Sequence, residues 1–423
     1  MLVAALTCAV LALTVGSARA ASQSAADPEP RLNAATWLLL DAGDGERLAA
    51  HGPGEERAIA STTKLMTAYL ALTKLRMKQR LEVPEYSAAA AESVAGLIEG
   101  EKLTVHDLLL AMMLPSANDA AQTVAQGVAG SEREFVTKMN RAAADLGLDH
   151  THYANPIGLD EKGNYSTAGD LTDLSLELLA DRRFRKIVSR PEATLKSGSQ
   201  ERRVVNTNTL MLTDPSVDGV KTGHTLDAGY VLVASAKRDG VPLIAAVLGA
   251  PSEADRDAET EKLLDYGYSL YAQRVPVERR EEMAVAEVRF EDQALSLVAQ
   301  RPVEVSIRAD QDLQVDAEGP KEVEGPIEAG DRLGQVTVTV DGKFVDRTPL
   351  LAGRDVDEPT VVDRIGGPLV AALIVLAAIV ILAAVAFALL RRRDQKRETE
   401  RDPEERMKTR QERIRRRRGG EGE

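Results

Sequence analysis

The chain has almost no cysteine: Cys8 is the single one among 423 residues. It lies in an apolar run, residues 1–20, which ends in Ala18-Arg19-Ala20, the small-x-small pattern of a cleavable signal peptide. Removal of this run leaves a chain without thiols, which excludes disulfides and cysteine catalysis and fits export. The run lacks the usual basic residues at its start, and a start codon upstream of Met1 would explain that.

The five histidines give no metal site. His150 and His152 alternate in the sequence, and no His-Glu-x-x-His pattern or third ligand lies nearby. We therefore expect no metal and no other cofactor. The chain also lacks an excess of positive charge, because 66 acidic residues outnumber 53 basic ones. A net charge of −13 argues against nucleic acid as a partner.

Charged residues are missing altogether from Leu369 to Leu390, a stretch of 22 residues. At 1.5 Å per residue, such a helix is long enough to cross a bilayer of about 30 Å. Arg391, Arg392 and Arg393 follow at once, and the positive-inside rule then places the basic tail, residues 391–423, in the cytoplasm. The sequence thus predicts a single-pass protein of the cell membrane whose long N-terminal part lies outside.

The pattern of apolar residues predicts two folded domains before this span. The first, 31–275, follows a linker at 21–30 and has helices between the early and late strands of one sheet, an α/β (α+β) arrangement. The second, 276–353, alternates apolar and polar residues and contains the turn dipeptide Asp341-Gly342. It is predicted to be a small all-β domain that holds the first off the membrane, with a linker at 354–368.

Within the first domain, we expect particular strands and helices from the periodicity. The expected strands are 36–42, 47–50, 229–236 and 241–248, and the expected helices are 105–114, 119–128, 131–146, 252–272 and one that starts at Ser61. Ser131-Glu132-Arg133-Glu134 is a capping box at the start of one of them.

Three short strings carry the chemistry: Ser61-Thr62-Thr63-Lys64, Ser116-Ala117-Asn118 and Lys221-Thr222-Gly223. Ser-x-x-Lys, Ser-x-Asn and Lys-Thr-Gly in this order describe a serine enzyme whose base is an amine. Residues three apart share one face of a helix, so Lys64 is delivered beside Ser61. A lysine acts as a base only when neutral, and burial near a second cation, here Lys221, lowers an ammonium pKa.

Each string also has a plain structural interpretation. Ser61 and Ser116 are good helix caps, Lys64 alone would be a solvated lysine, and Lys-Thr-Gly occurs in ordinary turns. The flanks favour catalysis, because Ala58-Ile59-Ala60 and Leu65-Met66-Thr67-Ala68 put Lys64 in apolar surroundings. Burying a charged lysine costs several kcal/mol, so a lysine in apolar surroundings indicates a functional role.

With these strings, the chain resembles the low-molecular-mass penicillin-binding proteins, the serine-type D-alanyl-D-alanine carboxypeptidases of bacterial cell walls. The resemblance runs from about Arg31 to about Gly353 and includes Asn155-Pro156-Ile157-Gly158-Leu159 and Tyr165-Ser166-Thr167-Ala168. It implies a catalytic domain like that of serine β-lactamases and penicillin-binding proteins. It also implies two partners: stem peptides of peptidoglycan that end in D-Ala-D-Ala, and β-lactams as inhibitors.

The resemblance also implies roles. Ser61 would attack the peptide, and Lys64 would accept its proton. Ser116, held by Asn118 and Lys221, would protonate the departing D-alanine.

The resemblance implies binding roles for further residues. Thr222 and Gly223 would bind substrate, and Arg256 would support the substrate carboxylate. The backbone N–H groups of Ser61 and His224 would form the oxyanion hole.

Three alternative functions remain open at this point. A class A β-lactamase needs a Glu-x-x-Leu-Asn string, which does not occur between Asn118 and Lys221. A transpeptidase or endopeptidase of the same wall differs only in the acceptor or the bond. A penicillin-sensing, wall-binding module without catalysis would not need every catalytic group. One departure from the family is the C-terminal span, since many members end in an amphipathic helix lying on the membrane.

Overall fold

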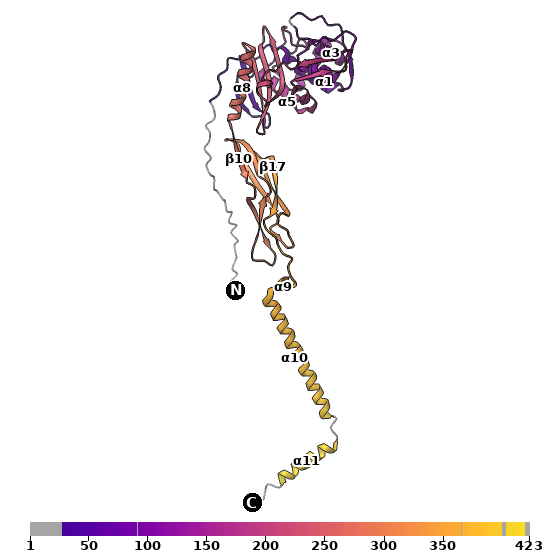
Figure 1. The fold of residues 1–423 in the computed structure, drawn as a ribbon, viewed down its shortest axis with the longest axis vertical. Coiled ribbons are helices and arrows are strands. Elements are labelled where there is room, and N and C mark those ends of the chain that lie inside the picture. Colours follow the sequence, from indigo (N-terminus) through magenta and orange to yellow (C-terminus); the bar gives the residue numbers. More distant parts are fainter. Residues whose placement is uncertain (1–27, 91, 365, 400–402, 419–423) are drawn as a thin grey trace, which may run out of the picture. The chain divides into compact units, whose positions relative to one another are not determined.

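The computed structural model describes residues 28–90, 92–364, 366–399 and 403–418 (Figure 1). The predicted leader and most of the linker after it therefore lie outside the described residues. The chain divides into two compact units, one running to Arg274 and including Val305–Gln311, the other comprising Val275–Glu304 and the residues from Asp312 onward. Each unit has a sheet of its own.

The first unit is built on a five-stranded sheet of order β2-β1-β9-β8-β7, in which every neighbouring pair is antiparallel. The strands are β1 (Thr36–Asp41), β2 (Arg47–His51), β7 (Val217–Thr225), β8 (Gly229–Arg238) and β9 (Val241–Ala250). The strands predicted from the early and late apolar runs are confirmed, and they meet in one sheet as expected.

Both faces of this sheet are buried. Along β1, Leu38 and Leu40 pack into a core with the helices that precede β7, whereas Leu39 packs into a second core with Leu263 and Leu264 of α8 (Glu253–Ser269). Successive strand residues point to opposite faces, so a strand covered on both sides reads as a continuous apolar run. This explains why 36–42 shows no alternation of polar and apolar residues.

The helical block between β2 and β7 supplies the chemistry-bearing segments. It contains η1 (Ala60–Thr63, a 3₁₀ helix), α1 (Lys64–Lys74), α2 (Val105–Met113), α3 (Asn118–Ala129), α4 (Glu132–Asp145), α5 (Ala168–Ala180), α6 (Arg182–Val188), α7 (Leu210–Thr213), and two hairpins, β3 (Arg80–Glu82) with β4 (Lys102–Thr104) and β5 (Glu192–Leu195) with β6 (Arg202–Val205).

The predicted helices are present, with ends shifted by up to three residues. The cap predicted for α4 is confirmed, because Ser131 Oγ accepts a hydrogen bond from the Glu134 backbone N–H. The helix predicted from Ser61 onward is confirmed, but its first turn is of the 3₁₀ type: residues 60–63 form η1, and the α-helix α1 begins at Lys64. The sequence patterns did not predict α5, α6 or the two hairpins.

The second unit contains an all-β domain with a six-stranded sheet of order β14-β16-β17-β12-β11-β15. Its strands are β11 (Glu282–Val288), β12 (Leu295–Ala299), β14 (Leu313–Glu318), β15 (Glu322–Val323), β16 (Arg332–Val340) and β17 (Lys343–Ala352), while β10 (Tyr271–Val277) and β13 (Val303–Arg308) form a separate two-stranded sheet. The predicted turn joins β16 to β17: Asp341 and Gly342 both have positive φ, as a tight hairpin turn requires.

Three helices follow the β domain: α9 (Val361–Arg364), α10 (Gly367–Thr399) and α11 (Pro403–Arg418). Within α10, the stretch Gly367–Lys396 contains an 18-residue window with a mean hydropathy of 3.3, and none of that window is buried in the protein. By length and composition this helix can cross a membrane, and it contains the predicted span. It is the candidate membrane anchor of the chain.

Candidate active site

Ser61 and Lys64 come together at the junction of η1 and α1. A 3₁₀ helix has three residues per turn, so residues i and i+3 lie directly above one another. Lys64 Nζ accordingly lies 2.9 Å from Ser61 Oγ. The lysine side chain is completely buried, whereas Ser61 is partly exposed. The serine is therefore reachable by a substrate, and the amine behind it is shielded from water.

Burial determines the charge of Lys64. Loss of hydration, and then the positive charge of Lys221, hold the pKa of Lys64 well below its usual range; Glu92 and Asp119 oppose this shift. The direction is the one predicted from the apolar flanks and the second lysine. Two buried ammonium groups in one site cannot both keep their charge easily, so this pair favours a neutral amine next to Ser61.

A backbone carbonyl holds the amine in place from the other side. Lys64 Nζ donates to the carbonyl of Ile157 at 2.6 Å. Asn155 shapes this loop, because its Oδ1 accepts from the backbone N–H groups of Gly158, at 2.7 Å, and of Leu159. Sequence reasoning gave Ile157 no role. The only sequence feature that pointed to this loop was the string Asn155–Leu159, which is part of the family resemblance.

Gly158 has no room for a side chain. Its φ is +87°, and a Cβ there would lie 2.0 Å from the Ala60 carbonyl oxygen and 3.0 Å from Ser61 Cα. We expect Gly158→Ala to destabilise the fold by about 3 kcal/mol or more and to displace Ser61. Thermal unfolding and the rate of acylation by a fluorescent penicillin measure the two effects.

Gly163→Ala is the matched control for this prediction. Gly163 has a similar φ of +91°, but its nearest neighbour, His152 Nδ1, would be 3.5 Å from the new Cβ. This variant has only the backbone penalty, about 1–2 kcal/mol, and keeps its acylation rate. Equal losses in the two variants would show that the contact of Gly158 with η1 does not matter.

Ser116 lies between α2 and α3 in a strained conformation, with φ +66°. Its hydroxyl is buried and has no hydrogen-bond partner within the described part of the chain. The expectation that Asn118 and Lys221 hold Ser116 is therefore wrong for this structure. Their polar atoms are engaged elsewhere: Asn118 Nδ2 donates to Glu92 at 2.8 Å, and Lys221 Nζ donates to the carbonyl of Thr222 at 2.9 Å.

The Ser116 hydroxyl is one of eight buried side-chain polar atoms without a hydrogen-bond partner in the described part of the chain. More than nine in ten buried polar groups have a hydrogen-bond partner, and an exception in a native protein needs a reason. Bound substrate would supply that partner. Glu92, in contrast, was missed by sequence reasoning, since it lies 26 residues before Asn118 and in no motif.

Lys221, Thr222 and Gly223 lie on β7, the edge strand of the sheet. A Cβ on Gly223 would come within 3.0 Å of the Ser61 backbone nitrogen, so the strand passes very close to η1. Lys221 is buried, and this burial, together with the charge of Arg256, lowers its pKa to about 7. Thr222 Oγ1 lies 2.6 Å from Thr207 Oγ1. An edge strand with free backbone groups can pair with an extended peptide.

His224 is the residue after Gly223 on β7, and Arg256 belongs to α8. His224 is exposed and stacks on Tyr230, with ring centroids 4.0 Å apart. Arg256 is a buried residue of α8 that donates to Asp257, Glu253 and Thr209. It influences the site through its charge on Lys221.

The described residues contain no cluster of three or more His, Cys, Asp or Glu side chains able to hold a metal ion. His150 Nδ1 lies 3.3 Å from Glu56 Oε1, and His152 Nδ1 lies 2.5 Å from the Gly163 carbonyl oxygen. Both histidines thus have ordinary structural partners.

Comparison with known proteins gives matches for both units. The family described as D-alanyl-D-alanine carboxypeptidase matches residues 21–252, and that described as penicillin-binding protein 5, C-terminal domain, matches residues 271–358. The D-alanyl-D-alanine carboxypeptidase DacF of Bacillus subtilis is 33% identical over 328 residues, 75% of this chain and 84% of that protein.

Solved structures agree with these matches. Penicillin-binding protein 5 from Haemophilus influenzae is 29% identical, with a TM-score of 0.55, and the match covers 78% of this chain and all of that one. The Streptomyces K15 DD-transpeptidase is 33% identical, also with a TM-score of 0.55, over 58% of this chain and all of that one.

Proposed function

The chain belongs to the D-alanyl-D-alanine carboxypeptidase family and is a serine peptidase, and we propose that Ser61 is its nucleophile. The reaction removes the terminal D-alanine from peptidoglycan stem peptides through an acyl-enzyme. The observation that carries the assignment is the 2.9 Å separation between Ser61 Oγ and the fully buried Lys64 Nζ. The experiment that tests it is release of D-alanine by the intact chain and by Ser61→Ala.

In the acylation step, neutral Lys64 takes the hydroxyl proton of Ser61 as Oγ attacks the carbonyl carbon between the two D-alanines. The negative charge that develops on the carbonyl oxygen is stabilised by the backbone N–H groups of Ser61 and His224. The C–N bond then breaks as Ser116 passes its hydroxyl proton to the departing amine and takes up the proton held by Lys64, which leaves Lys64 neutral for deacylation. The Ser116 hydroxyl is buried and has no hydrogen-bond partner among the described residues, so it can take part in this transfer.

Deacylation follows the steps of acylation in reverse order, with water as the attacking group in place of the amine of D-alanine. Water attacks the ester carbonyl, its proton goes to the amine of Lys64, and Ser61 leaves with a proton restored to Oγ. The free acid of the shortened peptide and one D-alanine are the products. β-Lactams acylate Ser61 in the same way, and the family is known by that property. The transpeptidase and sensor alternatives are not favoured by the comparisons.

The substrate is bound by β7 and by Asn118. An extended stem peptide pairs with the edge of β7, and Gly223 lets this strand pass close to η1 and its Ser61. The substrate carboxylate is bound by Thr222 and by the positive charge of Lys221, which Arg256 supports from behind. Asn118, at the first position of α3, binds the peptide on the opposite side.

The membrane anchor gives the enzyme its location. We propose that α10 spans the cell membrane once, with the catalytic unit outside and the basic tail in the cytoplasm, because Arg391–Arg393 follow the apolar segment directly. The β domain, 276–353, then acts as a pedestal. Protease added to intact cells is expected to degrade the catalytic unit and to leave a C-terminal tag intact. Inverted vesicles should give the opposite pattern; a tag cut in intact cells would overturn the orientation.

A further inference from the structure

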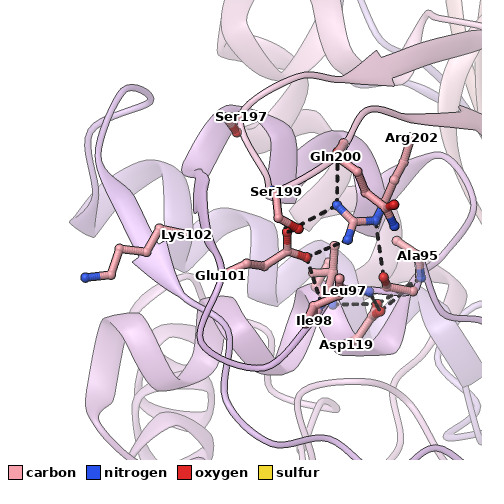
Figure 2. A network of polar contacts seen from close by, with 12 residues as sticks. Ala95, Leu97, Ile98, Glu101, Lys102, Asp119, Ser197, Ser199, Gln200 and Arg202 are labelled. Carbon is pink, nitrogen blue, oxygen red and sulfur yellow. Dashed lines mark hydrogen bonds and ion pairs between the residues drawn. The ribbon is translucent and has the colours of Figure 1, made fainter.

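A short segment, residues 92–101, borders the candidate active site and is fixed to the rest of the protein by buried charges. Its first anchor is Asp119, the second residue of α3, whose carboxylate accepts from the backbone N–H groups of Ala95, at 3.0 Å, and Leu97, at 2.9 Å. Figure 2 shows this carboxylate beneath the turn of the segment. Because Asp119 directly follows Asn118, the segment is tied to the start of α3, where the Ser-x-Asn string ends.

The second anchor is a buried ion pair at the other end of the segment. Arg202 Nη2 and Glu101 Oε1 lie 2.7 Å apart, and both side chains are more than nine-tenths buried (Figure 2). Arg202 Nε also donates to the Gly96 carbonyl at 3.2 Å, and Glu101 accepts from the backbone N–H groups of Ile98 and Ser199. The segment is therefore held through its middle and at its C-terminal end, and the residue at its start has contacts of its own.

That residue is Glu92. Its Oε2 accepts from Asn118 Nδ2 at 2.8 Å and from the Tyr86 hydroxyl, while its Oε1 accepts from the Ala89 backbone N–H at 2.9 Å. Burial opposes ionisation of Glu92, but these three hydrogen bonds and the charge of Lys64 outweigh it and lower the pKa of the carboxyl. Glu92 is thus a carboxylate at neutral pH.

An ionised carboxylate can only accept hydrogen bonds. Asn118 must therefore turn its NH₂ group toward Glu92, and its Oδ1 is left on the other side. The segment reinforces this orientation, since the Asn118 backbone N–H donates to the Ser93 carbonyl at 2.7 Å. A side-chain amide in solution has two flip states, and here the neighbouring charge selects one of them.

The same carboxylate acts on Lys64. The charged groups that influence this amine come from three elements: Lys221 on β7 lowers its pKa, whereas Glu92 on the segment and Asp119 on α3 raise it. Removing the charge of Glu92 therefore shifts the balance further toward the neutral amine. Glu92 is not needed as a proton carrier in any step of the reaction.

We infer that Glu92 is a positioning residue for acylation: it fixes the amide of Asn118 in one orientation and sets the charge environment of Lys64. This inference rests on the proposed function of Ser61 and Lys64. It concerns a residue outside the three catalytic strings, and it predicts an effect of charge that a purely structural loop residue would not have.

The test compares Glu92→Gln with Glu92→Asp in the full chain. The glutamine has the same shape but no charge, and it can face either flip state of Asn118. We expect the rate constant for acylation by a fluorescent penicillin to fall about tenfold, the size of one charge-assisted hydrogen bond. We also expect the rising limb of its pH profile to move to lower pH. Glu92→Asp keeps the charge, so its limb stays near that of the unchanged chain.

Glu99→Gln is the matched control, because Glu99 is an exposed residue of the same segment. It should change neither the rate nor the limb, and thermal unfolding shows whether each variant keeps its fold. An unchanged rate and limb in Glu92→Gln would overturn the inference, as would equal losses in Glu92→Gln and Glu92→Asp with no movement of the limb. If the unchanged chain is not acylated at all, the proposed function itself fails.

Discussion

Ser61→Ala abolishes release of D-alanine from a peptide ending in Lys-D-Ala-D-Ala, with a fall in rate on the order of 10⁴-fold or more. The reason is that no acyl-enzyme forms without the hydroxyl of Ser61, which is the hydroxyl that contacts Lys64 Nζ in the described part of the chain. Lys64 Nζ, 2.9 Å from Ser61 Oγ, would then have no hydroxyl to activate. The measurement is D-alanine released by the intact chain and by the variant at equal concentration.

Ser87→Ala is the control for this prediction, since Ser87 is an exposed serine outside the site and should release D-alanine at the unchanged rate. The variant at position 61 should also lose covalent labelling by a fluorescent penicillin. Release that persists in Ser61→Ala would contradict the assignment of the nucleophile. No release from the intact chain would instead favour a sensor, or a transpeptidase that awaits an amine acceptor.

Much of the fold was predictable because the core strands and helices carry strong local patterns. The apolar runs 36–42 and 241–248 pair directly in the sheet, with Leu38 opposite Ala246. The α4 cap was readable from Ser131 alone. By contrast, α5 and α6 were missed although local signals exist: Thr167 caps α5 and Asp181 caps α6, and the buried Leu171, Leu174 and Leu178 of α5 have helical spacing.

The candidate site was predictable only where its chemistry is local in sequence. Ser61 and Lys64 are three residues apart, so any helical turn brings them together. Glu92 and the Ile157 carbonyl reach the same site across 26 and 93 residues of chain, and no periodicity specifies such contacts. A backbone carbonyl in particular leaves no mark on the sequence of side chains.

The 3₁₀ turn at η1 is a related case. Ala60 has φ +46°, and Gly158 lies so close to the Ala60 carbonyl that it has no room for a side chain. A neighbouring loop therefore contributes to the conformation at the start of the helix. Ser and Thr are weaker helix formers than Ala, so local propensity does not fix the type of helix at residues 60–63, and the contact with Gly158 contributes to it. The consequence for catalysis is direct, because the 3₁₀ geometry aligns the side chains of Ser61 and Lys64.

Lys64→Arg should reduce acylation about 10³-fold, although it keeps a positive charge and a long side chain. A guanidinium cannot lose its proton in a protein, so the variant has no base. In the unchanged chain, the acylation rate should rise with pH as Lys64 loses its proton. Because burial and Lys221 lower the pKa of Lys64, the rate should level off well below 10.4, the ordinary lysine value.

Lys74→Arg, an exposed change in the last turn of α1, is the matched control and should keep both the rate and its pH profile. The variant at position 64 should show a low rate without the rising limb. A limb that continues to climb at pH 10 in the unchanged chain would mean that Lys64 is an ordinary charged lysine. In that case burial would not have made it a base, and Ser61 would need another proton acceptor, which the described residues around its hydroxyl do not offer.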